Sequence, residues 1–383
     1  MQEHNNALPL SKTDTRTSRS QRVTINDLAQ ELGLAKGTVS RALNGYPDIA
    51  QRTVLRVKKT AEKMGYAPLA HAQAIRTGSS RALALVLHTG EPDAQRPFLA
   101  GFIAGITTAA SQEHWSLTVA TAKTDDEMLT TMRRLIREGK ADGFILPRTK
   151  TLDSRIDLCR SEGVPFILFG RTGEDQQCAW FDFLGEDAVS GAVKHLFGLG
   201  HVRMGFINGP AEFNFSRLRE RSFLNAVSEF GVSTQTDIVR SGATTPDEAE
   251  KLAKELLTHS EPPTAIVCAT DHIALGVYHA AEALGLKVGE DIATIGYGGA
   301  PEGSVARPGL TTYEVDNRLA GERLAKMLIQ LIRGATPEHL RETAPAQLIT
   351  RGSDGPMTLS SEELRARILI ELVKVCKPRE ELI

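Results

Sequence analysis

Residues 23–44 constrain the fold of this chain more than any other stretch. Apolar residues recur there at three- and four-residue spacing on both sides of Gly33, which predicts two short crossed helices. Thr24 with Asp27 three residues later has the form of a capping box, so the first helix should begin there. Gly33 suits the tight turn between them, because larger residues resist positive φ. The stretch predicts a helix-turn-helix, with an ordinary helical hairpin as the alternative.

More helix is expected directly after this stretch. Residues 51–64 have the pattern of a third helix, and they are followed by Gly65-Tyr66-Ala67-Pro68 and a short Ala-rich segment, 69–76.

Together these motifs resemble the head-piece of the lactose-repressor (LacI/GalR) family of bacterial transcription regulators. The resemblance rests on VTI, GTVSRALN, the helix ending in MGY, and Tyr-x-Pro before a hinge helix, and it covers about residues 22–352. It implies a homodimer on a pseudo-palindromic operator in double-stranded DNA, because one helix-turn-helix contacts only a half-site. On family grounds, repression is expected rather than activation.

Charge is distributed unevenly along the 383 residues. The formal net charge is −2, but residues 19–81 hold 11 Lys+Arg against 4 Asp+Glu, whereas residues 82–383 hold 32 against 41. A basic head on an acidic body suits a protein whose head alone binds phosphates.

The sequence indicates a reduced, cytoplasmic protein without a membrane span. Residues 1–20 are polar, lack the apolar core of a signal peptide and are expected to be disordered. No apolar run reaches the 18 or so residues of a membrane helix. The cysteines Cys159, Cys178, Cys268 and Cys376 are widely spaced and form no CxxC motif.

The body has the alternating strand–helix pattern of a doubly wound α/β fold. Buried strands are expected at 82–87, 117–120, 143–146, 166–169, 204–207, 265–268 and 294–296. Helices are expected at 98–113, 125–138, 187–198, 215–230, 246–257 and 272–284. The resemblance implies two such lobes of the periplasmic-binding-protein type, with a sugar-like effector in the cleft between them.

Four segments follow from these observations. They are a disordered tail (1–20), a helix-turn-helix domain with hinge helix (22–77), a two-lobed effector-binding and dimerisation domain (80–352), and a C-terminal helical extension (353–383).

The second helix of the head is expected to enter the major groove. Lys36, Gly37 and Arg41 occupy the positions that select the operator in the family, and Arg41 suits a bidentate contact to guanine. Polar residues suited to holding phosphates are Thr24, Thr38, Ser40, Asn44 and Thr53. The alternative for each of these alone is a helix cap or a solvated surface residue.

The hinge helix of the family wedges an apolar side chain into the minor groove and kinks the DNA. Ile75 stands at the wedge position, where the family usually has Leu. The family's Asn after the proline is Leu69 here, and a frequent Arg is Gln73. A plain linker helix is the alternative.

Six residues are expected to bind the effector, because ligands of open α/β sheets bind just beyond the carboxyl ends of strands. They are Phe98, Arg171, Arg217, Thr270, Asp271 and Tyr297, with Arg217 matched to the arginine that binds sugar hydroxyls in the family. An ion pair is the alternative for Arg171, and a helix cap is the alternative for Asp271. Two family acids are absent, at Gly298 and in residues 182–185, which suggests a larger or more apolar pocket for an oligosaccharide or modified sugar.

Enzyme classes lack their motifs in this sequence. There is no GxSxG, HExxH or P-loop, and no glycine completes a dinucleotide fingerprint after Gly298. We therefore expect no catalytic residue, cofactor or metal site. A sugar-binding transport protein shares the two-lobed body, but it needs an export signal and has no use for a basic head.

A C-terminal helix is expected beyond residue 360. Ser360 and Glu363 form a capping box before an apolar stripe of Leu364, Ile368, Leu372 and Val375. The stripe either docks on its own body or adds a contact that turns a dimer into a tetramer.

Overall fold

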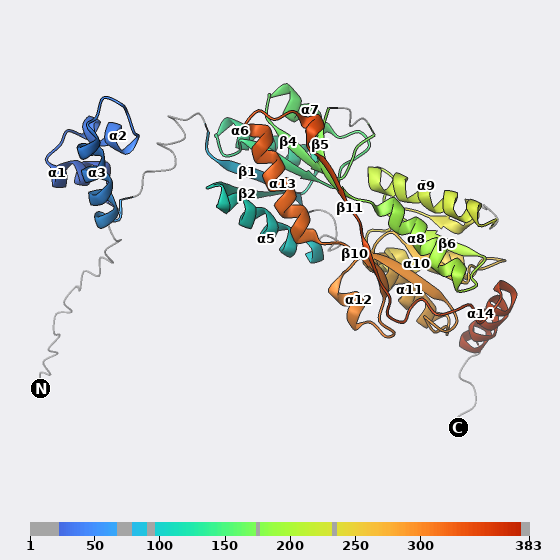
Figure 1. The fold of residues 1–383 in the computed structure, drawn as a ribbon. Helices are drawn as coiled ribbons and strands as arrows, with labels where there is room; N and C mark the ends of the chain where they lie inside the picture. Colours follow the sequence, from blue (N-terminus) through green and yellow to red (C-terminus); the bar gives the residue numbers. More distant parts are fainter. Residues whose placement is uncertain (1–22, 67–78, 90–95, 174–176, 232–235, 377–383) are drawn as a thin grey trace, which may run out of the picture. The chain divides into compact units, whose positions relative to one another are not determined.

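The computed structural model describes residues 23–66, 79–89, 96–173, 177–231 and 236–376. The chain divides into two compact units, Met1–Gly78 and Ser79–Ile383 (Figure 1). The wedge residue Ile75 and the rest of the hinge segment, 69–76, lie outside the described residues, as does the N-terminal tail.

Three helices make up the described part of the head. They are α1 (Ile25–Leu32), α2 (Lys36–Leu43) and α3 (Gln51–Met64). Thr24 and Asp27 form the predicted capping box, and Gly33 adopts the left-handed conformation with φ of 63°. A small core holds the three helices together, made of Leu28, Ala29, Leu32, Val39, Ala42, Val57 and Ala61. The predicted helix-turn-helix is confirmed.

The body contains two sheets among its described residues. The first has the strand order β11-β5-β4-β3-β1-β2 and the second β12-β10-β9-β8-β6-β7. The first sheet's strands are β1 (Ala82–His88), β2 (Ser116–Ala122), β3 (Gly143–Pro147), β4 (Phe166–Phe169), β5 (Ala179–Phe183) and β11 (Arg341–Ala344). The second sheet's strands are β6 (Met204–Ile207), β7 (Val239–Arg240), β8 (Ala265–Cys268), β9 (Ala293–Gly298), β10 (Thr311–Glu314) and β12 (Gln347–Ile349).

Helices cover these sheets, as the strand–helix alternation predicted (Figure 1). They are α5 (Arg96–Gln112), α6 (Asp125–Arg137), α7 (Ser154–Ser161), α8 (Gly185–Gly198), α9 (Asn214–Glu229), α10 (Pro246–Leu257), α11 (Asp271–Ala283), α12 (Pro301–Val305) and α13 (Asn317–Ile332). All strand pairs are parallel except β10 with β12. The predicted doubly wound, two-lobed architecture is confirmed.

The chain passes between the two sheets three times. It leaves the first sheet after β5, returns to it through α13 after β10, and crosses again from β11 to β12. Helix α13 packs closely on α5, where a Cβ added to Gly105 would lie 2.1 Å from the Arg318 carbonyl oxygen. These crossings place the ends of strands from both lobes around one region of the body.

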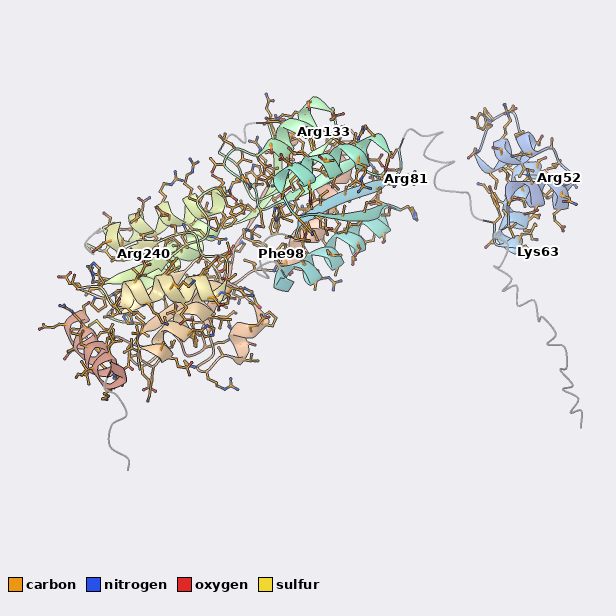
Figure 2. All side chains as sticks on the ribbon, turned by 180° about the vertical axis from the view of Figure 1, so that it is seen from behind. Arg52, Lys63, Arg81, Phe98, Arg133 and Arg240 are labelled. Atoms are coloured by element: carbon orange, nitrogen blue, oxygen red, sulfur yellow. The ribbon has the colours of Figure 1, made fainter. Side chains whose placement is uncertain are left out.

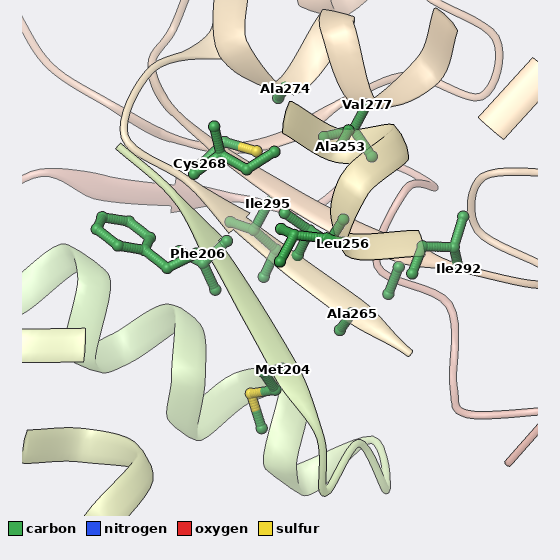
Figure 3. Packing of buried hydrophobic residues seen from close by; sticks show 14 of the residues in the cluster. Met204, Phe206, Ala253, Leu256, Ala265, Cys268, Ala274, Val277, Ile292 and Ile295 are labelled. Atoms are coloured by element: carbon green, nitrogen blue, oxygen red, sulfur yellow. The ribbon is translucent and has the colours of Figure 1, made fainter. Parts of the chain in front are cut away.

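A continuous apolar core fills the second lobe. It includes Met204, Phe206, Leu256 and Ile295 (Figure 3). The last described helix, α14 (Ser361–Cys376), adds Leu364 and Ile368 to this core.

The remaining apolar residues of α14 have different surroundings. Leu372 is exposed, with Leu369, Ile370 and Val373 beside it. The side chain of Val375 lies outside the described residues. The stripe therefore docks on its own body through its first two members.

Candidate functional site

The surface of α2 presents the residues predicted to contact bases. Lys36, Gly37 and Arg41 are exposed, whereas Val39 and Ala42 face the core of the head. Gly37 and Arg41 are four residues apart and so share one face of the helix. A Cβ added to Gly37 would meet no atom within 4 Å, so the space beside Arg41 is open.

Arg41 does not extend freely into solvent. Its Nη2 lies 2.6 Å from Asp48 Oδ2, and its guanidinium lies 4.8 Å from the centre of the Tyr46 ring. This ion pair holds the pKa of the Asp48 carboxyl below its usual value and raises that of Arg41. The sequence patterns did not indicate the pair, because Arg41 lies on α2 whereas Asp48 lies in the irregular loop between α2 and α3.

The polar residues predicted to hold phosphates lie on the three helices of the head or at their caps. Thr24 is engaged in its capping box, and Asn44 Nδ2 donates to the Ser40 carbonyl oxygen at 2.6 Å. Thr38 is half-buried on α2, and Thr53 is half-buried in the first turn of α3. Positive side chains that include Arg52 and Lys63 are exposed along α3 (Figure 2). The arrangement suits a positively charged surface against a phosphate backbone.

The body contains a cavity of about 220 Å³ beyond the carboxyl ends of β3, β4, β5 and β9. From the first lobe it is lined by Phe98, Pro147, Arg148, Thr149, Phe169, Gly170, Asp182 and Phe183. From the second lobe and the crossing segments it is lined by Phe215, Arg219, Thr270, Asp271, His272, Tyr297, Gly298, Gly299, Ala300, Val315 and Asn317. The cavity lies where open α/β sheets bind ligands. Phe98, at the start of α5, is one of its walls (Figure 2).

Arg219 is the buried cation of this cavity. Only 9% of its surface is exposed, and its Nη1 donates to the Ala269 carbonyl oxygen at 2.8 Å. The guanidinium lies 4.0 Å from the centre of the Tyr297 ring and 5.0 Å from that of Phe215. Among the described residues its Nε has no hydrogen-bond partner. The Nε atom faces Gly185, where an added Cβ would lie 2.7 Å away, while the Arg219 side chain lines the cavity.

Arg217 lies elsewhere, although the sequence comparison favoured it. It does not line the cavity, and its Nη2 lies 3.4 Å from Asn214 Oδ1. Residues two positions apart in an α-helix are separated by about 200° around its axis, so Arg217 and Arg219 point in nearly opposite directions. Helical phase was the missed signal, because Arg219 falls on the face of α9 that buries Ser216 and Phe223.

Arg171 is held in ion pairs beside the cavity and is absent from its lining. Its Nε lies 2.7 Å from Asp182 Oδ2 and its Nη2 lies 2.6 Å from Glu186 Oε1. Burial raises the pKa of Asp182, and the contact with Arg171 opposes this shift. Arg171 therefore positions Asp182, which itself lines the cavity. The ion-pair alternative describes this arginine.

Thr270 and Asp271 line the cavity, but their polar atoms serve the fold. Thr270 caps α11 by accepting from the Ile273 amide. Asp271 is 1% exposed, and its two oxygens accept from Thr312 Oγ1 and from the Ala300 amide, both at 2.5 Å. Burial raises the pKa of this carboxyl, against the hydrogen bonds that lower it.

Aromatic side chains form much of the remaining wall. Tyr297 and Phe98 were predicted, whereas Phe169, Phe183 and Phe215 were not. Phe169 stands 6.2 Å from Phe183, ring centre to ring centre. The predicted apolar character of the pocket agrees with these walls. Flat apolar faces beside a few directed donors are typical of sites for small ligands such as sugars.

No group of three metal-ligating side chains comes together in the part of the chain that the structure describes. Within the same residues, no helix is long and apolar enough to cross a membrane.

Comparison with known proteins matches both units. Residues 24–68 match the family described as bacterial regulatory proteins, lacI family, and residues 193–353 match the periplasmic binding protein-like domain. The HTH-type transcriptional regulator AglR of Rhizobium meliloti (strain 1021) is 32% identical over 342 residues, which cover 87% of this chain and 95% of AglR.

Two solved structures extend the similarity to the fold. The transcriptional regulator CelR in complex with cellobiose is 25% identical, with a TM-score of 0.67 over 87% of this chain and all of the CelR chain. The lac repressor dimer bound to operator and the anti-inducer ONPF has a TM-score of 0.73 at 24% identity, over 88% of this chain and all of that one, and shows the same fold. The relatives are transcriptional regulators and not enzymes. This chain belongs to the LacI family of bacterial DNA-binding transcriptional regulators.

Proposed function

We propose that this regulator represses genes of carbohydrate transport or catabolism, and that a sugar-like effector in the body cavity changes its affinity for operator DNA. The observation that carries the proposal is Arg219, a buried guanidinium that lines the cavity between aromatic walls. A planar guanidinium gives directed donors for sugar hydroxyls, and aromatic rings pack on the apolar face of a sugar. CelR, solved with cellobiose, supports a sugar of this class.

We assign effector binding to Arg219, Asp182, Phe98, Phe215 and Tyr297. Arg219 replaces Arg217 in this assignment, and Asp182 supplies an acceptor held in place by Arg171. Thr270 and Asp271 shape the wall. An effector that touches both lobes is expected to change the angle between them, with a coupling to DNA binding of about 1–3 kcal/mol.

We assign base reading to Arg41 and Lys36, with Gly37 leaving room for the groove. We assign the minor-groove wedge to Ile75. Phosphate contacts are assigned to Thr24, Thr38, Ser40, Asn44 and Thr53. Two heads on a pseudo-palindromic operator require a homodimer, as in the operator-bound lac repressor. We further propose a cytoplasmic location and the four-segment division at residues 1–20, 22–77, 80–352 and 353–383. The uneven charge and the helix-turn-helix disfavour a transport protein.

The test is binding-site selection from a randomised duplex library with the full-length protein. The selected duplex should bind more tightly than scrambled DNA at moderate salt. Cellobiose and other disaccharides should then shift that affinity in the wild-type protein, and the shift at the same sugar concentration should be much smaller in Arg219→Ala. Equal affinity for selected and scrambled duplexes would refute the regulatory assignment.

A further inference from the structure

We propose that Asp48 is a positioning residue that presets Arg41 for guanine recognition and limits its use as a general phosphate contact. This inference rests on the proposed function of Arg41 in base reading. It concerns the loop between α2 and α3, to which no DNA-binding role has been given so far.

The loop holds Asp48 in a defined place. The Tyr46 amide donates to the Arg41 carbonyl oxygen at 3.1 Å, and the Ile49 amide donates to the Tyr46 carbonyl oxygen at 3.2 Å. Ile49 packs against the core of the head. Asp48 is a short side chain on this braced loop, whereas Arg41 is long and has many rotamers. The carboxylate therefore orients the guanidinium, and not the reverse.

Stability alone does not account for the pair. Both side chains are about half exposed, at 49% and 50%, and pairs of this kind contribute little to folding. A carboxylate next to a DNA-binding surface also opposes phosphate binding, because the two charges repel. Because Asp48 lowers the affinity for DNA of any sequence, it is useful at this position only if it improves the recognition of particular sequences.

The donor count of arginine allows both contacts at once. A guanidinium has five N–H donors in a plane, and the contact with Asp48 occupies Nη2 on one side. The donors that remain are sufficient for the O6 and N7 atoms of one guanine. Tyr46 lies along the face of the same group and restricts its rotation out of that plane. An arginine oriented before binding loses less conformational entropy when it meets the base.

The inference predicts opposite changes in two quantities when Asp48 is neutralised. Asp48→Asn keeps the shape of the side chain and removes its charge. Affinity for scrambled DNA should rise about twofold, because one repulsion of phosphate is gone. Discrimination between the selected duplex and the same duplex with the Arg41-dependent guanine replaced should fall about fivefold, because Arg41 is no longer oriented.

Glu62→Gln is the matched control. Glu62 is an exposed acid in the last turn of α3, so its neutralisation changes the charge of the head equally. It should raise affinity for scrambled DNA and leave discrimination unchanged. Asp48→Glu should recover part of the discrimination that Asp48→Asn loses. Thermal melts followed by circular dichroism establish that each variant is folded.

The outcomes separate this inference from the proposed function. The experiment compares the full-length wild type with Arg41→Ala, Asp48→Asn and Glu62→Gln. Each protein is titrated against the selected, the guanine-substituted and the scrambled duplex. If Arg41→Ala retains wild-type discrimination at every guanine, base reading by Arg41 fails, and positioning by Asp48 fails with it. If Arg41→Ala loses discrimination while Asp48→Asn behaves like Glu62→Gln, the positioning role of Asp48 alone is overturned.

Discussion

The proposed function assigns one central arginine to the head and one to the body, and the two side chains have opposite surroundings. Arg41 is half exposed on a short helix and pairs with an acid seven residues away. Arg219 is 9% exposed between Phe215, one turn earlier on α9, and Tyr297 from the distant strand β9. In the proposed function, the accessible arginine enters a groove of the DNA, whereas the buried arginine is desolvated before it meets a small ligand.

Removal of the buried arginine should have the largest effect on ligand binding. Arg219→Ala deletes a charged donor from a desolvated site, which should weaken effector binding by about 1.5–3 kcal/mol. Isothermal titration with the disaccharide that shifts DNA affinity in the wild type measures this loss.

Arg217→Ala is the control for Arg219, since Arg217 lies on the other face of α9. Its effector affinity should stay within about twofold of the wild type. Equal losses in both variants would contradict the assignment of Arg219.

Removal of the exposed arginine should affect only DNA recognition. Arg41→Ala should lose about 1–3 kcal/mol of discrimination at one guanine of the operator, because the bidentate contact disappears. Fluorescence anisotropy with matched and substituted duplexes measures it. Effector affinity of the DNA-free protein should not change, and a parallel loss there would indicate damage to the whole chain.

A smaller change tests whether the position of Arg219 matters apart from its presence. A Cβ added at Gly185 would lie 2.7 Å from Arg219 Nε, so Gly185→Ala should displace the guanidinium. Effector binding should weaken by about 1 kcal/mol, which is less than in Arg219→Ala. Gly198→Ala, on the same helix with open space around it, is the control. Unchanged binding in Gly185→Ala would show that the cavity tolerates a shifted arginine.

The smallest expected effect is a pH dependence of stability that the body should show and the head should not. His201 is 2% exposed in the second lobe, and burial lowers its pKa. On acidification, His201 is therefore protonated at a higher pH in the unfolded chain than in the folded body. The free energy of unfolding of the body should fall as the pH drops below about 6.5. His201→Gln should flatten that part of the profile. The described head residues, 23–66, include no histidine, so the melting of the head should not show this dependence.

The same contrast explains what the sequence could predict. The head depends on local signals, and Thr24, Asp27 and Gly33 take the cap and turn roles that their spacing predicted. Apolar strands such as β1, β3 and β8 were also predicted, because both faces of each are buried. Short strands such as β7 and β12 were missed, since their pairing depends on partners far along the chain.

The cavity was predicted in place but only partly in composition. Phe98, Thr270, Asp271 and Tyr297 line it as expected, because they follow strands or begin helices at the carboxyl edge. The sequence prediction named Arg217 and not Arg219. A difference of two positions reverses the direction of a side chain on a helix. Asp182 was noted only as a residue of a changed motif, because its role depends on the contact with Arg171 across the strand end.

The central claim is that an effector bound in the cavity around Arg219 controls how tightly the head, with Arg41 on α2, binds DNA. The most direct test measures the affinity of the full-length protein for its selected duplex while disaccharides are titrated, in the wild type and in Arg219→Ala. We predict a change of about 5–150-fold for the effector in the wild type and a much smaller change in the variant at the same effector concentration. A protein that binds the selected and scrambled duplexes equally, or an Arg219→Ala variant that responds like the wild type, would contradict the account.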